Sequence, residues 1–329
     1  MRAIITSVGH YVPERILSNA ELEKMVDTSD EWITTRTGIK ERRILEEGKA
    51  SAYMGVEAAK KVLSKRNISA NEIDVIIVAT VTPDMFFPST AALIQKDLGA
   101  DNAWGIDVNG ACTGFLYALS TGAMMIESGR YQKILVIGSD KMSSITDYTD
   151  RNTCVLFGDA AGAVLLEPGK DDSLGVLDFL LRTDGSGGEY LKMPAGGSLR
   201  PATVETVQNR LHYIYQDGKT VFKFAVNGMA NISYDILEKH GLKGEDVKFF
   251  IPHQANLRII DAAAKKMKLS PEQVVINIDK YGNTTAATIP LALSEVVQEG
   301  KLKKGDIVVM AAFGAGFTWG SLLLKWAMD

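Results

Sequence analysis

Cys112 is the first residue whose surroundings suit chemistry. It lies in the segment VNGACTGFLYALSTGAMMIESG (108–129), where small residues surround the thiol and a helical pattern begins directly after it. A cysteine at a helix N-terminus meets unpaired backbone N–H groups and the positive end of the helix dipole, which favour the thiolate that attacks carbonyl groups. The segment alone is equally typical of a buried structural cysteine, since free cysteines are usually core residues.

Two further segments carry polar groups suited to acyl transfer. In FFIPHQANLRIIDAAAKKMK (249–268), an apolar strand ends just before His253, a place where α/β enzymes hold catalytic side chains. In KYGNTTAATIPLALSEVV (280–297), Asn283 stands in a polar turn before a helix, and its amide can donate to a developing oxyanion. Taken singly, the histidine is as typical of a helix start and the Gly–Asn pair of an ordinary turn.

A glycine-rich segment, AAFGAGFTWGS (311–321), lies near the end of the chain. Its spacing does not fit G-x-G-x-x-G, and an apolar strand-like run follows it instead of a helix, so the pattern argues against dinucleotide binding. A backbone N–H donor near a nucleophile is the better interpretation. The two cysteines and four histidines stand far apart in the sequence, so no zinc or other metal site is expected.

The composition narrows the class of protein. With 329 residues, 46% hydrophobic and 23% charged, the chain has the balance of a globular protein of about two domains. A net charge of −4 gives no general attraction to nucleic acid or to an anionic membrane. The first residues lack the apolar core of a secretory signal, and no apolar run approaches the roughly 18 residues that span a bilayer. With only two cysteines, a cytoplasmic location is expected.

Apolar, β-rich runs alternate with helical patterns, which predicts α/β layers with largely parallel strands. Residues 73–81, 133–139 and 306–313 are apolar enough to form strands buried on both faces. Residues 51–66 have helical periodicity, and Ser51 is expected to cap the start of that helix.

The two halves of the sequence resemble each other, and the matching pieces occur in the same order. Because buried strands can resemble one another by composition alone, the similarity favours an internal duplication without requiring it. We therefore expect two similar halves, residues 1–175 and 176–329, joined near a Gly- and Pro-rich surface excursion at 182–210. The matching pairs are 72–79 with 245–252, 133–141 with 306–313, and 157–168 with 313–326.

Together these segments resemble one family over nearly the whole chain: β-ketoacyl-acyl carrier protein synthase III, the initiating condensing enzyme of type II fatty acid synthesis. Elongating enzymes of this kind use a cysteine with two histidines, whereas this chain offers a histidine and then an asparagine, which indicates the initiating class. The motifs that carry the resemblance are ACTGF at Cys112, PHQANLRI at His253, YGNTTAATIP at Asn283, FGAGFTWGS at 313–321, DEWITTRTGI at 30–39 and DRNTCVLFGDAAGAV at 150–164.

The resemblance implies a thiolase-like α/β fold, with two similar halves in five layers, α-β-α-β-α. It also implies a two-stage reaction without a cofactor. Cys112 takes an acyl group from an acyl-CoA primer, expected to be acetyl-CoA, and CoA leaves. Malonyl-acyl carrier protein then loses carbon dioxide, and its enolate attacks the acyl-Cys112 thioester to give a 3-oxoacyl-acyl carrier protein, which initiates fatty acid biosynthesis.

The resemblance also assigns roles to individual residues. His253 through a ring N–H and Asn283 through its amide stabilise the malonyl enolate, while the backbone N–H groups of Cys112 and Ala315 form the oxyanion hole of the first stage. Family members usually have glycine at the position of Ala315, and alanine is acceptable there if φ stays negative.

The substrate contacts implied by the resemblance form three groups, and a homodimer is expected because Phe87 matches a residue that reaches the neighbouring subunit's acyl pocket. The CoA contacts are Thr28, Trp32, Arg36, Arg151 and Asn256. The acyl pocket includes Phe87 and Phe157, with Val81 and Met142 close by. The acyl carrier protein is expected to contact Lys223, Gln254, Arg258, Lys265 and Lys266.

Three alternatives remain open from the sequence. A papain-like hydrolase also uses Cys, His and Asn, but the C-G-[SA]-C-[WY] motif is absent. Another thiolase-fold enzyme, such as a hydroxymethylglutaryl-CoA synthase or a secondary-metabolite acyltransferase, would keep Cys112 and His253 but need not bind a carrier protein. A non-catalytic acyl-binding module would have no reason to hold Cys112, His253 and Asn283 together.

Overall fold

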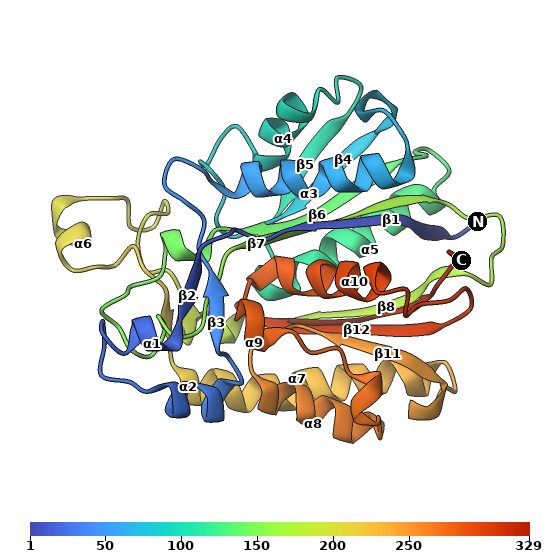
Figure 1. Cartoon of the computed structure of the whole chain (residues 1–329). Coiled ribbons are helices and arrows are strands. Elements are labelled where there is room, and N and C mark those ends of the chain that lie inside the picture. Colours follow the sequence, from blue (N-terminus) through green and yellow to red (C-terminus); the bar gives the residue numbers. More distant parts are fainter.

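Five layers of helix and sheet build the protein, which a computed structural model describes over residues 1–329 (Figure 1). Helices cover the outer face of each sheet, and further helices lie between the sheets. This is the α-β-α-β-α arrangement expected from the family resemblance, so that prediction is confirmed. The outer helices are α3 (Ser51–Arg66) with α4 (Thr90–Leu98) and α7 (Gly218–Lys239) with α8 (Leu257–Met267); the inner pair is α5 (Gly114–Glu127) and α10 (Thr288–Gln298).

The two sheets repeat one topology. The first has the order β1-β7-β6-β4-β5 and the second the order β8-β13-β12-β11, so β5 alone lacks a counterpart. The strands of the first sheet are β1 (Ala3–Tyr11), β4 (Val75–Ala79), β5 (Trp104–Val108), β6 (Ile134–Asp140) and β7 (Ala160–Pro168). Those of the second are β8 (Gly175–Thr183), β11 (Val247–Pro252), β12 (Ile307–Gly314) and β13 (Thr318–Lys325). The division at residues 175 and 176 itself stays a prediction.

The expectation of largely parallel strands is wrong. In the two large sheets, only β4 with β5, β4 with β6, and β11 with β12 pair in parallel, whereas four pairs are antiparallel. The apolar runs were correctly placed as strands, because β4, β6 and β12 fall on them. An apolar run indicates that both faces of its sheet are covered, and in this protein helices cover both faces of mixed sheets. The composition of a strand therefore does not indicate its direction relative to its neighbours.

Helix α3 begins and ends at the predicted residues, but its start is built differently. Ala50 occupies the N-cap position without a side-chain cap. The hydroxyl of Ser51 is instead buried and donates to the carbonyl of Thr82 at 2.7 Å. Ser51 therefore ties α3 to the loop after β4 and does not cap the helix.

Smaller helices and strands gather at one end of the two sheets, at the left of Figure 1. The excursion between β8 and α7 projects at the left of Figure 1. No helix of the protein has both the length and the apolarity to cross a membrane. The small elements are α1 (Asn19–Leu22), α2 (Asp30–Thr37), α6 (Val204–Gln208), α9 (Ile278–Tyr281), β2 (Ile16–Ser18), β3 (Glu41–Arg43), β9 (Leu191–Lys192) and β10 (Tyr215–Gln216).

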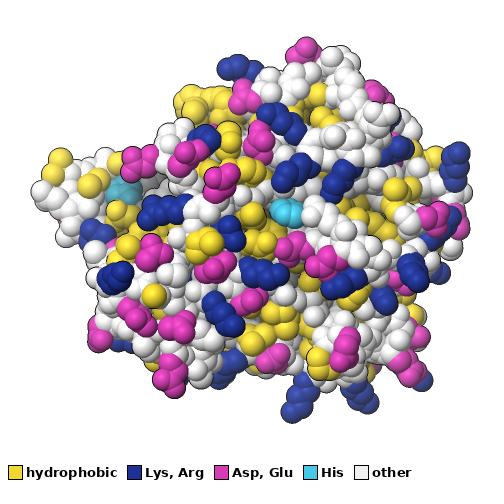
Figure 2. Space-filling view, viewed as in Figure 1, with side chains coloured by type: hydrophobic (Ala, Val, Ile, Leu, Met, Phe, Trp, Pro, Cys, Tyr) yellow, Lys and Arg dark blue, Asp and Glu magenta, His cyan; other side chains and the backbone are white.

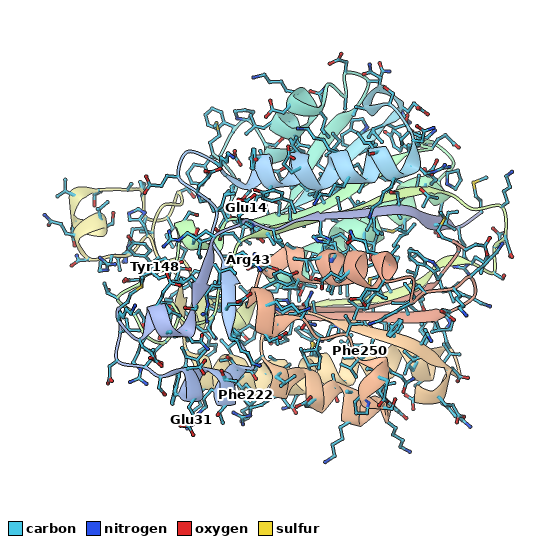
Figure 3. All side chains as sticks on the ribbon, in the orientation of Figure 1. Glu14, Glu31, Arg43, Tyr148, Phe222 and Phe250 are labelled. Carbon is cyan, nitrogen blue, oxygen red and sulfur yellow. The ribbon has the colours of Figure 1, made fainter.

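The core lies between the sheets and under the outer helices. Phe250 on β11 is fully buried against the α7 and α8 layer, and Phe222 on α7 lies nearer the surface (Figure 3). On the face shown in Figure 2, basic and acidic side chains are interspersed, which agrees with the small net charge. The layers therefore fix the strand ends rigidly, and loops at those ends carry the polar groups described next.

Candidate active site

A cavity of about 450 Å³ is lined by residues of both halves of the chain. Cys112, His253 and Asn283 all line it, although 141 residues separate the cysteine from the histidine in the sequence. The cavity wall is mostly apolar, with a few polar groups converging on one region, as is typical of small-molecule sites. The structure thus brings the three predicted catalytic residues to one place.

Cys112 lies in a single 3-10 turn, Ala111–Thr113, between β5 and helix α5. Ala111 has φ +46°, a left-handed conformation that is strained for a residue with a side chain. Gly314 packs directly on this turn, because a Cβ at position 314 would lie 2.8 Å from the nitrogen of Cys112. The end of β12 therefore holds the turn from the other half of the protein.

The acidity of Cys112 differs from the sequence prediction. Burial raises the pKa of the thiol to about 12, and the Asp140 carboxylate adds to the rise, while hydrogen bonds from its own backbone N–H and from Asn283 lower it. The helix N-terminus was expected to favour the thiolate, but desolvation of a side chain that is only 8% exposed is the larger effect. Cys112 is a thiol at neutral pH and needs a base to react.

His253 follows the last residue of β11, as predicted, and its backbone N–H donates to the carbonyl of Ala311 at 2.8 Å. Nδ1 of the ring lies 2.8 Å from the hydroxyl oxygen of Thr288, and Nε2 is buried without a hydrogen-bond partner. Burial lowers the pKa of the imidazole to about 3, so the ring is neutral at pH 7. A neutral ring with a free nitrogen beside the cavity can accept a proton from a thiol.

Asn283 is held by its own turn. The backbone N–H of Thr285 donates to Oδ1 of Asn283 at 2.9 Å, which leaves the NH2 group of the amide to reach Cys112. Thr285 has φ +52°, unusual for a β-branched residue, and its buried hydroxyl lines the cavity without a partner. The turn therefore adopts a strained backbone conformation, and this conformation places an N–H donor beside the nucleophile.

Asp140 is a buried carboxylate that the sequence analysis missed. It stands at the end of β6, and five hydrogen bonds reach it, including one of 3.0 Å from the backbone N–H of Ala286 to Oδ2. Burial raises its pKa to about 6 although these bonds lower it. Because Ala286 lies in the turn that follows Asn283, Asp140 ties that turn to the first sheet. Only the fold reveals this role, since an aspartate after a strand has no distinctive sequence signal.

Ala315, expected to supply an oxyanion-hole N–H, lines the cavity directly after β12. Its φ is not positive, so alanine meets the condition set from the sequence. With Gly314 against the nitrogen of Cys112, the turns of the two halves face each other across the cavity.

The predicted CoA contacts lie close together around helix α2. The guanidinium of Arg151 stands 5.0 Å from the centroid of the Trp32 ring, so the two groups contact each other and an adenine can enter between them only if one moves. Asn256 caps α8 by accepting from the backbone N–H of Arg258 at 3.0 Å, and it donates to the carbonyl of Arg36 at 2.9 Å. Of this group, only Asn256 lines the cavity.

The predicted carrier-protein contacts divide into two kinds. Lys223 on α7 and Arg258, Lys265 and Lys266 on α8 are exposed, with Asp261 of α8 among them. Gln254 is buried, and its amide bonds to Pro252, Val275 and Asn277 inside the fold. Its contact with a carrier protein stays a prediction, and the polar atoms of its side chain are bonded inside the fold.

The acyl-pocket residues differ in exposure. Phe157 is buried, lines the cavity and forms a bridge with Asn283, and Val81 and Met142 line the same cavity. Phe87 is 85% exposed and does not line the cavity of this single chain. The excursion predicted as surface loop at 182–210 also contributes Leu191, Lys192 and Met193 to the wall, which could not be foreseen from the sequence. Ile214 and Gln216, which follow the predicted excursion, line the same cavity.

Comparison with known proteins agrees with the resemblance seen in the sequence. Residues 106–185 match the family model of 3-oxoacyl-[acyl-carrier-protein] synthase III, and residues 237–326 match that of its C-terminal part. The β-ketoacyl-[acyl-carrier-protein] synthase III of Koribacter versatilis is 57% identical over 99% of this chain and 98% of its own length. The crystal structure of 3-oxoacyl-[acyl-carrier-protein] synthase III from Aquifex aeolicus superposes with a TM-score of 0.91 at 46% identity, covering 98% of this chain and 100% of that one. OleA from Xanthomonas campestris, at 19% identity and a TM-score of 0.84 over 99% of both chains, shares the fold alone.

Proposed function

The chain belongs to the β-ketoacyl-acyl carrier protein synthase III family, and from this premise we propose how its own residues divide the work of the reaction. The protein is an acyltransferase that condenses an acyl primer with malonyl-acyl carrier protein and so initiates fatty acid synthesis. Acetyl-CoA is the primer we propose. The observation that carries the assignment of residues is the convergence of Cys112, His253 and Asn283 on one cavity.

In the first stage, the Cys112 sulfur attacks the thioester carbonyl of the acyl-CoA. His253 takes the thiol proton, because the thiol has a pKa of about 12 and does not ionise by itself at neutral pH. The backbone N–H groups of Cys112 and Ala315 stabilise the tetrahedral oxyanion. Collapse of this intermediate releases CoA as a thiolate, which receives the proton from His253 and leaves as a thiol, and Cys112 keeps the acyl group.

In the second stage, malonyl-acyl carrier protein loses carbon dioxide, and negative charge develops on its thioester oxygen. The amide of Asn283 donates to that oxygen. A ring N–H of His253 adds a second donor only while Nε2 carries a proton, because Nδ1 is bonded to Thr288. The resulting carbon nucleophile attacks the acyl-Cys112 carbonyl, and cleavage of the C–S bond frees the cysteine as a thiolate. This thiolate takes a proton from water and so returns to the resting thiol. The products are 3-oxoacyl-acyl carrier protein and carbon dioxide. No cofactor takes part in this scheme.

Acyl-CoA and acyl carrier protein are proposed to approach the mouth of the cavity along α2, α7 and α8. Trp32 and Arg151 would hold the adenine, with Thr28 and Arg36 close by and Asn256 near the pantetheine. The exposed cations Lys223, Arg258, Lys265 and Lys266 outnumber Asp261, and this suits an acidic carrier protein.

We also propose a homodimer. Phe86 and Phe87 are 81% and 85% exposed on the loop after β4, an unusual exposure for aromatic side chains. In the same half, β5 is the unpaired edge of the first sheet and offers free backbone groups to a second copy. Because the proposed chemistry needs Cys112 as a free thiol, we propose that the protein works in the cytoplasm.

The function is tested with purified protein, malonyl-acyl carrier protein and a panel of straight and branched acyl-CoA primers. Mass spectrometry of the carrier protein identifies the product. A carrier-protein mass that corresponds to a 3-oxoacyl group extended from the acetyl primer supports the proposal. Product from longer primers only would contradict acetyl-CoA as the primer, and stable acylation without product would indicate an acyl-binding module.

A further inference from the structure

A single neighbour, Thr288, decides which ring nitrogen of His253 carries the proton. The ring makes one hydrogen bond, from Nδ1 to the hydroxyl oxygen of Thr288 at 2.8 Å, and Nε2 has none. Metal-free catalytic histidines are commonly oriented by a carboxylate or a carbonyl, which accept only and so fix the proton on the facing nitrogen. A hydroxyl can both donate and accept, so its other contacts decide which nitrogen carries the proton.

Those other contacts favour one arrangement. The hydroxyl oxygen of Thr288 also lies 3.3 Å from the carbonyl of Thr285, to which it can only donate. If the hydroxyl donates to this carbonyl, it must accept from Nδ1–H of His253. Nδ1–H, the hydroxyl and the carbonyl then each have a hydrogen-bond partner. If it donates to Nδ1 instead, the buried carbonyl of Thr285 loses this bond. The first arrangement places the lone pair of the ring on Nε2.

We propose that Thr288 is a positioning residue that holds the proton of His253 on Nδ1 in the resting enzyme, so that Nε2 presents its lone pair to the Cys112 thiol. The inference rests on the proposed function and names the origin of the base that the first stage needs. The thiol proton moves to Nε2 as the sulfur attacks the acyl-CoA carbonyl, and the same proton then moves from Nε2 to the departing CoA sulfur. His253 is neutral, with its proton on Nδ1, before and after this stage.

The local sequence explains how one turn serves both polar partners. Asn283 and Thr288 stand at the two ends of the segment NTTAAT, with the 3-10 turn Thr285–Ala287 between them. Thr288 is the first residue of α10 and is 2% exposed. The turn thus presents an amide to Cys112 from one end and a hydroxyl to His253 from the other, and Asp140 anchors it through Ala286.

Thr288→Val tests the proposal, because valine keeps the shape of threonine and removes the hydroxyl. Without the hydroxyl, no neighbour selects the Nδ1–H form, so the Nε2–H form, in which the base is lost and an N–H donor is gained, becomes populated. We expect acylation of Cys112 by acetyl-CoA to slow by roughly 10- to 100-fold. Carbon dioxide release from malonyl-acyl carrier protein by fully acylated enzyme should stay within about threefold of wild type.

Two matched variants control for packing. Thr288→Ser restores the hydroxyl and should recover acylation to within about threefold of wild type. Thr284→Val removes a buried hydroxyl of the same turn that has no partner, and it should leave both stages unchanged. Equal losses of both stages in Thr288→Val, or no loss of acylation, would overturn the proposal.

The tautomer itself is measured in the wild type, which does not depend on a variant that folds. In protein labelled with 15N-histidine, the resonances of His253 are assigned by their loss in His253→Gln. Protonated Nδ1 and unprotonated Nε2 at neutral pH support the proposal, and the reverse pattern overturns it. Failure to form any 3-oxoacyl product would instead contradict the proposed function while leaving this measurement valid.

Discussion

Gly314→Ala should damage the active site through the contact between the two halves of the protein. A Cβ at this position would lie 2.8 Å from the nitrogen and 3.1 Å from the Cβ of Cys112, and 3.2 Å from the nitrogen of Thr113. Ordinary contacts of a Cβ begin at 3.4 Å, so the end of β12 or the Cys112 turn must move by about 0.6 Å. The nearest obstructing atom belongs to backbone, so no side-chain rotation relieves the clash.

Such a displacement acts on both the oxyanion hole and the stability of the protein. It separates the backbone N–H groups of Cys112 and Ala315, whose alignment the first stage requires, and misplacement on this scale is expected to slow acylation by roughly 10- to 100-fold. Overpacking should lower the free energy of unfolding by about 1 to 3 kcal/mol.

Quenched-flow acylation by labelled acetyl-CoA and a thermal unfolding scan measure the two effects of Gly314→Ala. Gly197→Ala is the matched control, because a Cβ at position 197 meets nothing within 4 Å. The control should acylate as the wild type does. Wild-type acylation in Gly314→Ala would refute the idea that this glycine is required for close approach of the two halves.

Further predictions concern separate features of the protein. Asn283→Ala should reduce malonyl decarboxylation by about 100- to 1,000-fold and Cys112 acylation much less, when the two stages are timed separately by quenching; the reverse order would contradict its role. Because the folded state raises the pKa of Cys112 from 9.0 to about 12, the stability that its bound proton provides is lost as pH rises above about 9. Above about pH 9, the unfolding free energy of wild type should therefore fall relative to that of Cys112→Ala by roughly 1 kcal/mol per pH unit. Parallel curves of unfolding free energy against pH for the two proteins would contradict a raised pKa of Cys112. Arg258→Glu with Lys265→Glu should weaken malonyl-acyl carrier protein binding in a salt-dependent way and leave acetyl-CoA use nearly unchanged; equal losses for both substrates would show that the patch serves the shared cavity mouth. Arg42→Met removes a buried guanidinium that bonds three acceptors, so chemical denaturation should show a loss of about 2 to 4 kcal/mol, and an unchanged midpoint would refute its structural role.

The sequence was sufficient to predict site residues that are marked by their type and by the helix, strand or turn beside them. Cys112 before a helix, His253 after an apolar strand and Asn283 in a polar turn are each ambiguous, but the structure places them at one cavity. The duplication was also visible, because strands in equivalent positions of the two sheets have similar apolar runs. Strand direction was not visible, since an apolar run reports burial on both faces and nothing about its neighbours.

The parts that could not be predicted depend on contacts between distant segments. Whether Cys112 ionises is decided by desolvation and by Asp140 on another strand, and these outweigh the local helix effect. Thr288 is one threonine among several in its segment until the fold places it 2.8 Å from His253. Gln254 follows His253 directly and is predicted to contact the carrier protein, but the sequence does not show that its amide is bonded within the fold.

The proposed reaction requires that Cys112 carries the acyl group between the two substrates. The direct test is intact-protein and peptide mass spectrometry after incubation with acetyl-CoA, followed by a chase with malonyl-acyl carrier protein. We expect one acetyl group on the peptide that contains Cys112, none on Cys112→Ala, and loss of the label in the chase as 3-oxoacyl-acyl carrier protein forms. An acetyl group on another residue, or equal labelling of Cys112→Ala, would contradict it.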